Sequence, residues 1–277
     1  MRSIHIQHLL KSIGTVAVMS AAPVATDVLA QTRQSELSAR GRTPAASTDN
    51  SDDEGVSYRF KNASDSASWA RGRSLAAKSS GYRIVVSLQD RHVWALIGRD
   101  TVLSAPAAVA KGTTLEFGNS AWKFVTPRGV RTVLGKDADP IWQPPEWLYA
   151  ETALANDLKL GHIYVGKPIK LRDGRILTVR DGYVGIMDGG VFGRLPIDEH
   201  IVFEGKLYIP PMGTKNRMVE GELGKYRLNL GDGYLLHGTP YKESIGMAAT
   251  HGCIRLRDED IEWLYDHIPV GTKVYIY

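Results

Sequence analysis

The chain has 277 residues, of which 43% are hydrophobic and 23% charged, and its formal net charge is +4. This length fits one sizeable domain with additions or two small domains, and the hydrophobic fraction is ordinary for a globular protein with a real core. No cluster of Lys and Arg resembles a nucleic-acid-binding surface, so we expect no nucleic-acid partner. The single cysteine, Cys253, excludes an internal disulfide.

The first 30 residues have the features of a secretory signal peptide. Arg2 and Lys11 are basic, an apolar run follows over residues 13–22, and Val28-Leu29-Ala30 resembles a cleavage site. The run is shorter than the roughly 20 apolar residues that a transmembrane helix needs. We therefore expect export to the periplasm or cell envelope, with membrane contact only if this segment stays uncleaved as an anchor.

Residues 31–80 are rich in Ser, Ala, Asp and Arg, and the stretch 47–54 is polar without periodicity. A segment of this composition cannot bury enough surface to offset its ordering entropy. The sequence therefore predicts a disordered linker here, in which Tyr58, Phe60 and Trp69 are candidates for a short docked piece.

The folded domain is predicted over residues 81–277. Residues 84–88 and 93–97 are β-rich runs joined by a short polar turn, and a further run follows at 101–103. Asp-Gly turns recur between short apolar or β-branched runs, at residues 173–174, 181–182, 188–189 and 232–233. Turns this closely spaced favour a mainly β sandwich or barrel over a doubly wound α/β fold.

Two segments have helical patterns. One runs roughly over residues 146–160, after two prolines. The other starts at Asp258 as the expected N-cap and has apolar residues at helical spacing, namely Ile261, Leu264, Tyr265 and Ile268. Pro269 ends it, and residues 274–276 are predicted to form a final strand.

The residues that carry chemistry lie in two short segments, His237-Gly238 and Thr250-His251-Gly252-Cys253. A thiol is mostly protonated at neutral pH, whereas the thiolate is the competent nucleophile. A neighbouring imidazole can take that proton and return it to a leaving amine. A glycine beside the cysteine lets backbone N–H groups approach a developing oxyanion. The spacing by itself does not bring the two segments together.

Other interpretations of these residues remain open from the residue pattern alone. Cys253 can be a small buried hydrophobe, and His237 a core histidine. His237, His251 and Cys253 can also be read as zinc ligands, but their spacing matches no common zinc pattern and a fourth ligand is not evident. We therefore expect no metal. Four other scattered histidines are expected at the surface: His92, His162, His200 and His267.

The two segments resemble the signature of the YkuD-type L,D-transpeptidases, a His-Gly followed after a dozen or so residues by Ser/Thr-His-Gly-Cys. The match extends to Thr126-Pro127-Arg128-Gly129, which is similar to the family's Thr-Pro-x-Gly element, and to residues 223–228, the strand that leads to the His. The resemblance covers roughly residue 82 to the C-terminus, including the residues and helix after Cys253.

Two features depart from the family pattern. Pro240 and Tyr241 stand where many members carry Asn and another small or polar residue. Residues 140–212 are more than a minimal domain needs, and this predicts an insertion or lid within the domain.

The resemblance implies an L,D-transpeptidase-type β-sandwich or barrel-like domain with a few short helices. It implies that Cys253 attacks the carbonyl of an L-centre–D-Ala bond in a peptidoglycan stem tetrapeptide, releasing D-Ala and forming a thioester. His237 would be the proton donor and acceptor, held by a backbone carbonyl near Gly238. The N–H groups of Gly252 and Cys253 would bind the oxyanion, and His251 would shape the site. No cofactor is implied. The implied substrate-binding residues are Arg255, Gly238, Thr250 and Tyr234.

Arg255 has a second interpretation, an ion pair with Asp258 or Asp260.

For the whole protein, the first interpretation is a cell-wall cross-linking transferase, which passes the acyl group to an amine of a second stem peptide. The alternatives are an L,D-carboxypeptidase or endopeptidase, a transferase that anchors a protein to peptidoglycan, and a non-catalytic wall-binding module. The presence of both His237 and Cys253 argues against the last, and the segment 140–212 is where we expect the acyl acceptor to be selected.

Overall fold

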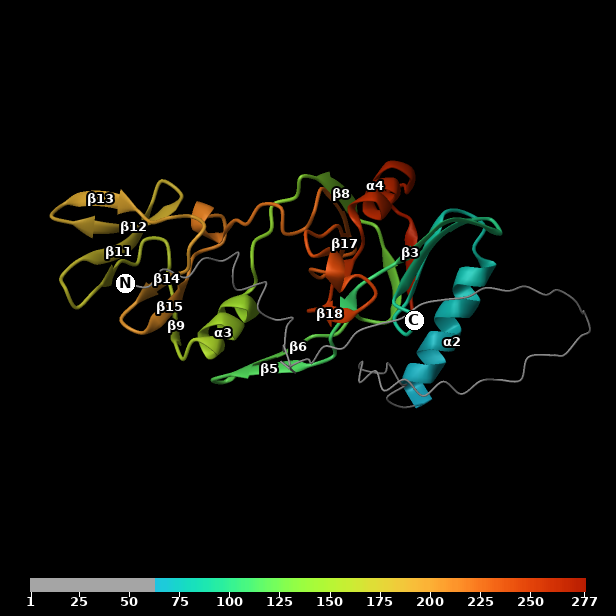
Figure 1. Cartoon of the computed structure of the whole chain (residues 1–277), viewed down its shortest axis with the longest axis horizontal. Helices are drawn as coiled ribbons and strands as arrows, with labels where there is room; N and C mark the ends of the chain where they lie inside the picture. The colour runs from blue at the N-terminus through green and yellow to red at the C-terminus, as the bar shows by residue number, and fades with distance from the viewer. Residues whose placement is uncertain (1–62) are drawn as a thin grey trace, which may run out of the picture.

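The computed structural model describes residues 63–277 and is mainly β in that range, as predicted. The predicted signal peptide and the first part of the predicted linker lie outside the described residues. The described part is elongated, with one group of strands at each end (Figure 1). No helix within residues 63–277 is long and apolar enough to cross a membrane.

A five-stranded sheet with strand order β3-β2-β1-β20-β7 forms one end. Its last strand in sequence runs parallel to its first, so the C-terminal residues lie in the middle of the sheet. Ile84 and Val86 face the main core, while Val85 faces the opposite side. The strands are β1 (Arg83–Ser87), β2 (His92–Ile97), β3 (Asp100–Pro106), β7 (Gly129–Thr132) and β20 (Lys273–Ile276).

Helix α2 (Ala63–Lys78) occupies part of the predicted linker, so the prediction of disorder is wrong for these residues. The segment is rich in Ala, the strongest helix former. Ala76 packs with Val85 and Tyr275 on the outer face of the five-stranded sheet. The apolar side chains on that face of the sheet are buried by packing against the helix. The composition of residues 63–78 alone does not reveal this packing.

The second sheet, with order β19-β17-β16-β8, lies beside the first and shares the main core. Its strands are β8 (Gly135–Ala138), β16 (Tyr226–Asn229), β17 (Leu235–His237) and β19 (Ile254–Arg255). Helix α4 (Asp258–His267) buries Ile261 and Leu264 in that core. The helix starts where predicted, but its N-cap is Arg257 without a side-chain cap, and not Asp258.

Two short strand pairs connect these sheets to the rest of the chain. They are β4 (Val109–Ala110) with β18 (Ala248–Thr250), and β5 (Thr114–Phe117) with β6 (Ser120–Lys123). The first pair is parallel and brings the residues before Cys253 beside a segment far away in sequence. Two 3-10 helices, η2 (Lys215–Arg217) and η3 (Lys242–Ser244), complete the loops.

Residues 140–212, here called the inserted segment, form the other end of the molecule in Figure 1. It has apolar clusters of its own, one around Leu177 and Val184 and one around Tyr149 and Leu207. Its elements are α3 (Glu146–Ala155), β9 (Lys159–His162), β10 (Ile169–Lys170), β11 (Ile176–Arg180), β12 (Tyr183–Asp188), β13 (Val191–Arg194), β14 (Ile201–Phe203) and β15 (Lys206–Ile209).

Local sequence signals explain most boundaries in this segment. Asp181-Gly182 joins β11 to β12 with both residues at positive φ (50° and 74°), the geometry of a two-residue hairpin turn. Helix α3 begins at Glu146 as predicted but ends before the predicted Leu160, because Asp157 takes a φ of 52° and β9 follows. His200 is buried, contrary to the surface position that we expected.

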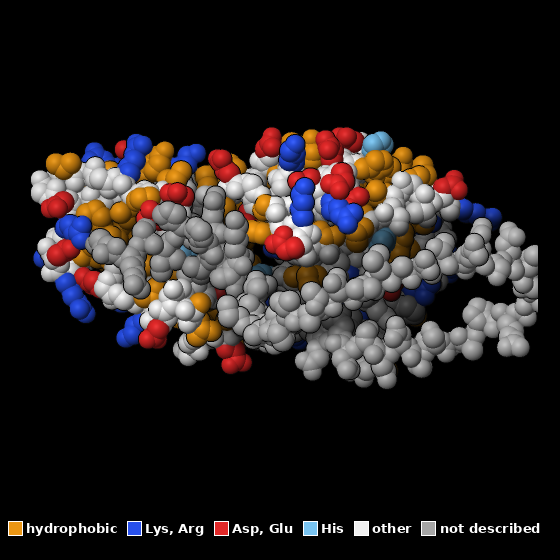
Figure 2. Space-filling view, in the orientation of Figure 1, with side chains coloured by type: hydrophobic (Ala, Val, Ile, Leu, Met, Phe, Trp, Pro, Cys, Tyr) orange, Lys and Arg blue, Asp and Glu red, His pale blue; other side chains and the backbone are white. Residues whose placement is uncertain are grey.

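Figure 2 shows Lys, Arg, Asp and Glu side chains intermixed on the face above β8, β17 and α4. Charges of both signs thus share this face, and no patch of one sign stands out on it.

Candidate active site

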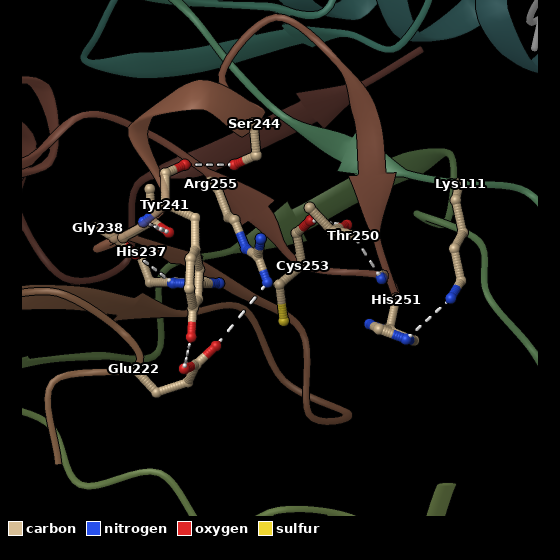
Figure 3. Close-up of polar contacts among 12 residues, drawn as sticks. Lys111, Glu222, His237, Gly238, Tyr241, Ser244, Thr250, His251, Cys253 and Arg255 are labelled. Atoms are coloured by element: carbon tan, nitrogen blue, oxygen red, sulfur yellow. Dashed lines mark hydrogen bonds and ion pairs between the residues drawn. The ribbon is translucent and has the colours of Figure 1, made fainter. Parts of the chain in front are cut away.

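The pairing of β17 with β19 places the predicted nucleophile and base on one face of a sheet. Leu236 pairs with Ile254 in parallel register, and both side chains are buried in the main core. Side chains alternate along a strand, so His237 and its register partner Arg255 project to the opposite face. Cys253 immediately precedes β19 and projects to that same face (Figure 3). The fold thus brings together two motifs that lie apart in the sequence.

His237 is buried and anchored by its own neighbour. Its Nδ1 lies 2.6 Å from the carbonyl oxygen of Gly238, which can only accept, so Nδ1 carries a proton. Nε2 is then the basic nitrogen of the neutral ring. Burial, and next the positive charge of Arg255, lower the pKa of His237 to about 3, although backbone hydrogen bonds act in the other direction. His237 is therefore a neutral imidazole at neutral pH, and the predicted backbone anchor is present.

Cys253 is a free, half-buried thiol. Its Sγ lies 3.8 Å from the carbonyl oxygen of Gly233, and within residues 63–277 the structure contains no hydrogen bond from Sγ to His237. Burial raises the pKa of Cys253, while a backbone hydrogen bond from Leu235 and the charge of Arg255 act to lower it. The resting site thus pairs a neutral thiol with a neutral imidazole.

Residues 250–253, here called the Cys253 loop, are held by two buried threonine hydroxyls. Thr250 Oγ1 donates to the Cys253 carbonyl at 2.6 Å and accepts from the Gly252 N–H at 3.2 Å. Thr126 Oγ1 donates to the Gly252 carbonyl at 2.9 Å and accepts from the Ala110 N–H at 3.1 Å. The predicted oxyanion donor Gly252 is therefore already engaged by Thr250, and Thr126 of the Thr-Pro-x-Gly element supports the loop from behind.

Two glycines of the signature are required by close neighbours. Gly252 has a φ of 153°, and a Cβ there would lie 3.1 Å from Cε1 of Tyr234. A Cβ on Gly238 would clash with Oδ1 of Asp258. Tyr234, predicted to bind substrate, is half-buried and lies between Gly252 and the guanidinium of Arg131, whose Cζ is 4.7 Å from the ring centroid.

Arg255 pairs with Glu222, and neither of the predicted partners Asp258 and Asp260 forms an ion pair with it. The distance from the guanidinium to Glu222 Oε1 is 4.0 Å, and the two side chains are 16% and 7% exposed. Tyr241 donates its hydroxyl to Glu222 Oε2 at 3.0 Å and lies against Arg255 (Figure 3). Burial raises the pKa of Glu222, with Arg255 and Tyr241 opposing that shift.

Glu222 was missed by sequence reasoning because nothing in its local pattern marks it. Tyr241, by contrast, was noticed as a departure from the family pattern, and the structure gives it a place beside Arg255. A buried carboxylate that meets its partners only through folding leaves no periodic signal in the sequence.

His251 turns away from His237 and into a cluster that includes helix α3. Its Nε2 lies 2.9 Å and 3.0 Å from the two carboxylate oxygens of Glu151, and 3.1 Å from Nζ of Lys111. Its ring stacks on Trp147 at 3.9 Å between centroids and meets Phe124 edge-on at 4.5 Å. This position fits the predicted site-shaping role. Lys111, Glu151 and Trp147 are further site residues that the sequence pattern did not indicate.

Comparison with known proteins agrees with this geometry. The model of the YkuD family, described as the L,D-transpeptidase catalytic domain, matches residues 81–276. This range includes both sheets, the inserted segment and every residue of the site described above. The chain belongs to the YkuD family of L,D-transpeptidase catalytic domains.

Curated relatives match over a shorter stretch. "Probable L,D-transpeptidase ErfK/SrfK" of Salmonella typhimurium is 46% identical over 66 residues, which cover 24% of this chain and 20% of the relative. "Probable L,D-transpeptidase YbiS" of Escherichia coli strain K12 is 44% identical over 66 residues, with the same coverage of 24% and 20%. The matched stretch thus spans about a fifth of the length of these relatives.

Two solved structures are similar at low sequence identity. The L,D-transpeptidase of Xylanimonas cellulosilytica is 17% identical, with a TM-score of 0.38 over 72% of this chain and 62% of that one. The catalytic domain of the E. faecium L,D-transpeptidase acylated by ertapenem is 15% identical, with a TM-score of 0.37 over 72% of this chain and 98% of that one.

Proposed function

We propose that this chain is a peptidoglycan L,D-transpeptidase in which Cys253 is the nucleophile and His237 its proton acceptor and donor. The observation that carries the proposal is the placement of both side chains on one face of the β17–β19 pair, inside a family match that spans residues 81–276. Their pKa shifts support proton transfer during attack and not before it, because a thiol with a raised pKa does not give its proton to an imidazole with a lowered pKa in the resting site.

In the first half-reaction, Cys253 Sγ bonds to the carbonyl carbon of the L-centre–D-Ala bond of a stem tetrapeptide, and the thiol proton passes to His237 Nε2. The C–N bond then breaks, the proton moves to the departing amine, and D-Ala leaves. A thioester remains on Cys253. The Gly238 carbonyl supports this role because it holds His237 with Nε2 unprotonated.

The Cys253 N–H is the oxyanion donor that we favour in this mechanism. The Gly252 N–H is bonded to Thr250 Oγ1, whereas no hydrogen bond of the Cys253 N–H is found among residues 63–277. Oxyanion donors act by pointing at the charge that develops during attack, so an unengaged N–H next to the thiol is suited to this task. Thr250 and Thr126 then serve to fix the loop that carries it.

In the second half-reaction, an amine of a second stem peptide bonds to the thioester carbonyl carbon and His237 takes its proton. The C–S bond then breaks, and that proton passes to the sulfur and restores the thiol. Water or a protein amine in the same position would make a carboxypeptidase or an anchoring transferase. We propose that the inserted segment helps to select the acceptor, because its helix α3 contacts the Cys253 loop directly.

Arg255 is proposed to orient a polar group of the substrate. Its Nε is buried without a hydrogen-bond partner, and its charge is only partly satisfied by Glu222 at 4.0 Å. A guanidinium binds carboxylates through several parallel hydrogen bonds, which makes a substrate carboxylate the preferred ligand. We also propose that the enzyme acts outside the cytoplasmic membrane after export, with residues 1–30 as signal peptide and the residues between them and helix α2 as tether to the catalytic domain.

The products of the reaction with disaccharide-tetrapeptides test the proposal. A cross-linked dimer together with free D-Ala is the expected result. Tripeptide alone would indicate hydrolysis, and unchanged substrate would refute catalysis on this class of molecule. Cys253→Ala is the control and should give none of these products.

Acylation by a carbapenem tests the nucleophile separately. The E. faecium domain was solved acylated by ertapenem, and we expect one ertapenem mass to add to this chain at Cys253. Peptide mapping locates the adduct. An adduct that survives in Cys253→Ala would contradict the assignment of the nucleophile.

A further inference from the structure

Helix α3 of the inserted segment contacts the Cys253 loop through two side chains, Trp147 and Glu151, and Glu151 makes the polar contact. Both of its carboxylate oxygens lie within 3.0 Å of His251 Nε2. His251 is two residues before Cys253 and belongs to the same loop. The contact therefore joins the inserted segment to the loop that carries Cys253.

The partners of His251 determine its protonation. Nε2 faces both oxygens of Glu151, which only accept hydrogen bonds, at 3.0 Å and 2.9 Å. The Lys111 ammonium, which only donates, lies farther away at 3.1 Å and already donates to Glu151. The two nearer acceptors therefore favour a proton on Nε2. Lys111 Nζ lies 2.7 Å from Glu151 Oε1. Although burial opposes it, hydrogen bonds from His251 and Lys111 hold the pKa of Glu151 below its usual value. Glu151 is thus an ionised acceptor, and His251 is the Nε2–H tautomer.

The surroundings of this triad strengthen its hold on the loop. The side chains of Lys111, Glu151 and His251 are 20%, 18% and 14% exposed, so water screens them only partly. Trp147, one turn before Glu151 on α3, stacks on the His251 ring. The backbone N–H of Lys111 also donates to the Thr250 carbonyl at 2.8 Å. Lys111 therefore contacts the loop through its backbone and Glu151 through its ammonium group.

We propose that Glu151 and Lys111 are positioning residues for Cys253: they hold His251 as the Nε2–H tautomer and so fix the loop that presents the thiol. The inference deepens the proposed function, on which it rests, and it gives the inserted segment a defined part in the site. A cysteine displaced by about 1 Å can lose roughly 100-fold in rate, so small movements of this loop matter.

Histidine NMR on the full chain tests the tautomer without requiring activity. In the wild type, the ¹⁵N long-range spectrum should assign the proton of His251 to Nε2. Glu151→Ala removes the acceptor and should give a mixture of tautomers, whereas Glu151→Gln keeps an amide oxygen and should retain Nε2–H. An unchanged tautomer in Glu151→Ala would overturn the proposal.

The rate of ertapenem acylation of Cys253 tests the consequence for the thiol. We expect a loss of roughly 10-fold to 100-fold in Glu151→Ala, a smaller loss in Glu151→Gln, and an intermediate loss in Lys111→Met, which keeps the His251–Glu151 contact. Glu146→Gln is the matched control, because Glu146 lies on the same helix and its carboxylate contacts the exposed His162 at 3.3 Å rather than the Cys253 loop. It should acylate like the wild type.

The NMR and acylation measurements distinguish the proposed nucleophile, Cys253, from the proposed positioning role of Glu151. If the wild type is not acylated, the proposed nucleophile is wrong, while the NMR result still decides the role of Glu151 in holding His251. If Glu151→Ala changes the tautomer but acylates at the wild-type rate, the positioning role for Cys253 is refuted. Should Glu151→Ala fail to fold, Glu151→Gln and Lys111→Met decide: wild-type acylation in both would refute the proposal.

Discussion

His237 and Arg255 are register partners in the parallel pairing of β17 and β19, so a buried imidazole lies beside a guanidinium. The positive neighbour and the burial both disfavour imidazolium. The arrangement keeps the proposed base neutral and makes its protonation costly for the fold.

Acid stability follows from this relationship. Because burial lowers the pKa of His237 from about 6.5 in the unfolded chain to about 3, the unfolded state binds a proton more readily. The stabilisation is fully present above pH 6.5 and is lost progressively as the pH falls from about 6.5 to about 3. Urea unfolding between pH 7.5 and 4.5 should show this loss. His237→Gln should have a shallower pH dependence, whereas His162→Gln, at the surface, should match the wild type.

The pH dependence of Cys253 alkylation reports the state of the thiol. Since burial raises the pKa of Cys253, the rate with iodoacetamide should still be rising at pH 9 and above. The charge of Arg255 acts to lower that pKa, so Arg255→Gln should react more slowly at pH 9 than the wild type. A plateau near pH 7 would instead indicate a thiolate–imidazolium pair and would contradict the neutral resting state.

Removal of the proposed base, His237, should distinguish a loss of proton transfer from a loss of access to the Cys253 thiol. We expect His237→Ala to be acylated by ertapenem about 10²- to 10⁴-fold more slowly, the usual contribution of a general base. Alkylation by iodoacetamide at pH 10, where hydroxide supplies the thiolate, should fall far less. Equal losses with both reagents would mean that the variant has a disturbed site rather than a missing base.

The pair formed by Arg255 and Glu222 should be energetically coupled. Arg255→Ala leaves the buried Glu222 with Tyr241 as its remaining partner, and we expect about 3 kcal/mol of lost stability. Glu222→Leu should be destabilising for the same reason, because it strands the guanidinium. The double variant should recover part of the loss, as measured by urea unfolding of all four proteins. Strictly additive losses would show that the pair at 4.0 Å is not coupled.

The glycine after the proposed base should be intolerant of a methyl group. Gly238→Ala would force its Cβ against Asp258 and within 3.3 Å of Ile261 Cγ2, and overpacking of this kind costs roughly 1–3 kcal/mol. Gly135→Ala is the control, since a Cβ there meets nothing within 4 Å, and its change should stay within about 0.5 kcal/mol. Comparable thermal midpoints for the two variants would contradict this account.

Much of the fold was predictable because its signals are local. The hairpin turn at Asp181-Gly182 and the start of α4 at Asp258 were read from residues adjacent in sequence. Helix α2 was not, because it docks Ala76 on a sheet whose strands come from the beginning and the end of the folded domain. The burial of His200 was not predicted either, because it depends on packing between segments and leaves no signal in the local sequence.

By itself, the sequence determined the family and the two residues on which the proposed chemistry rests, because short motifs with fixed spacing carry that information. Only the tertiary structure decided the partners of those residues. Arg255 meets Glu222 instead of the nearby Asp258, and His251 meets Glu151, a residue 100 positions away in sequence. Such contacts bring together side chains whose local patterns are unrelated, and they exist only once packing has placed the strands and helix α3 beside one another.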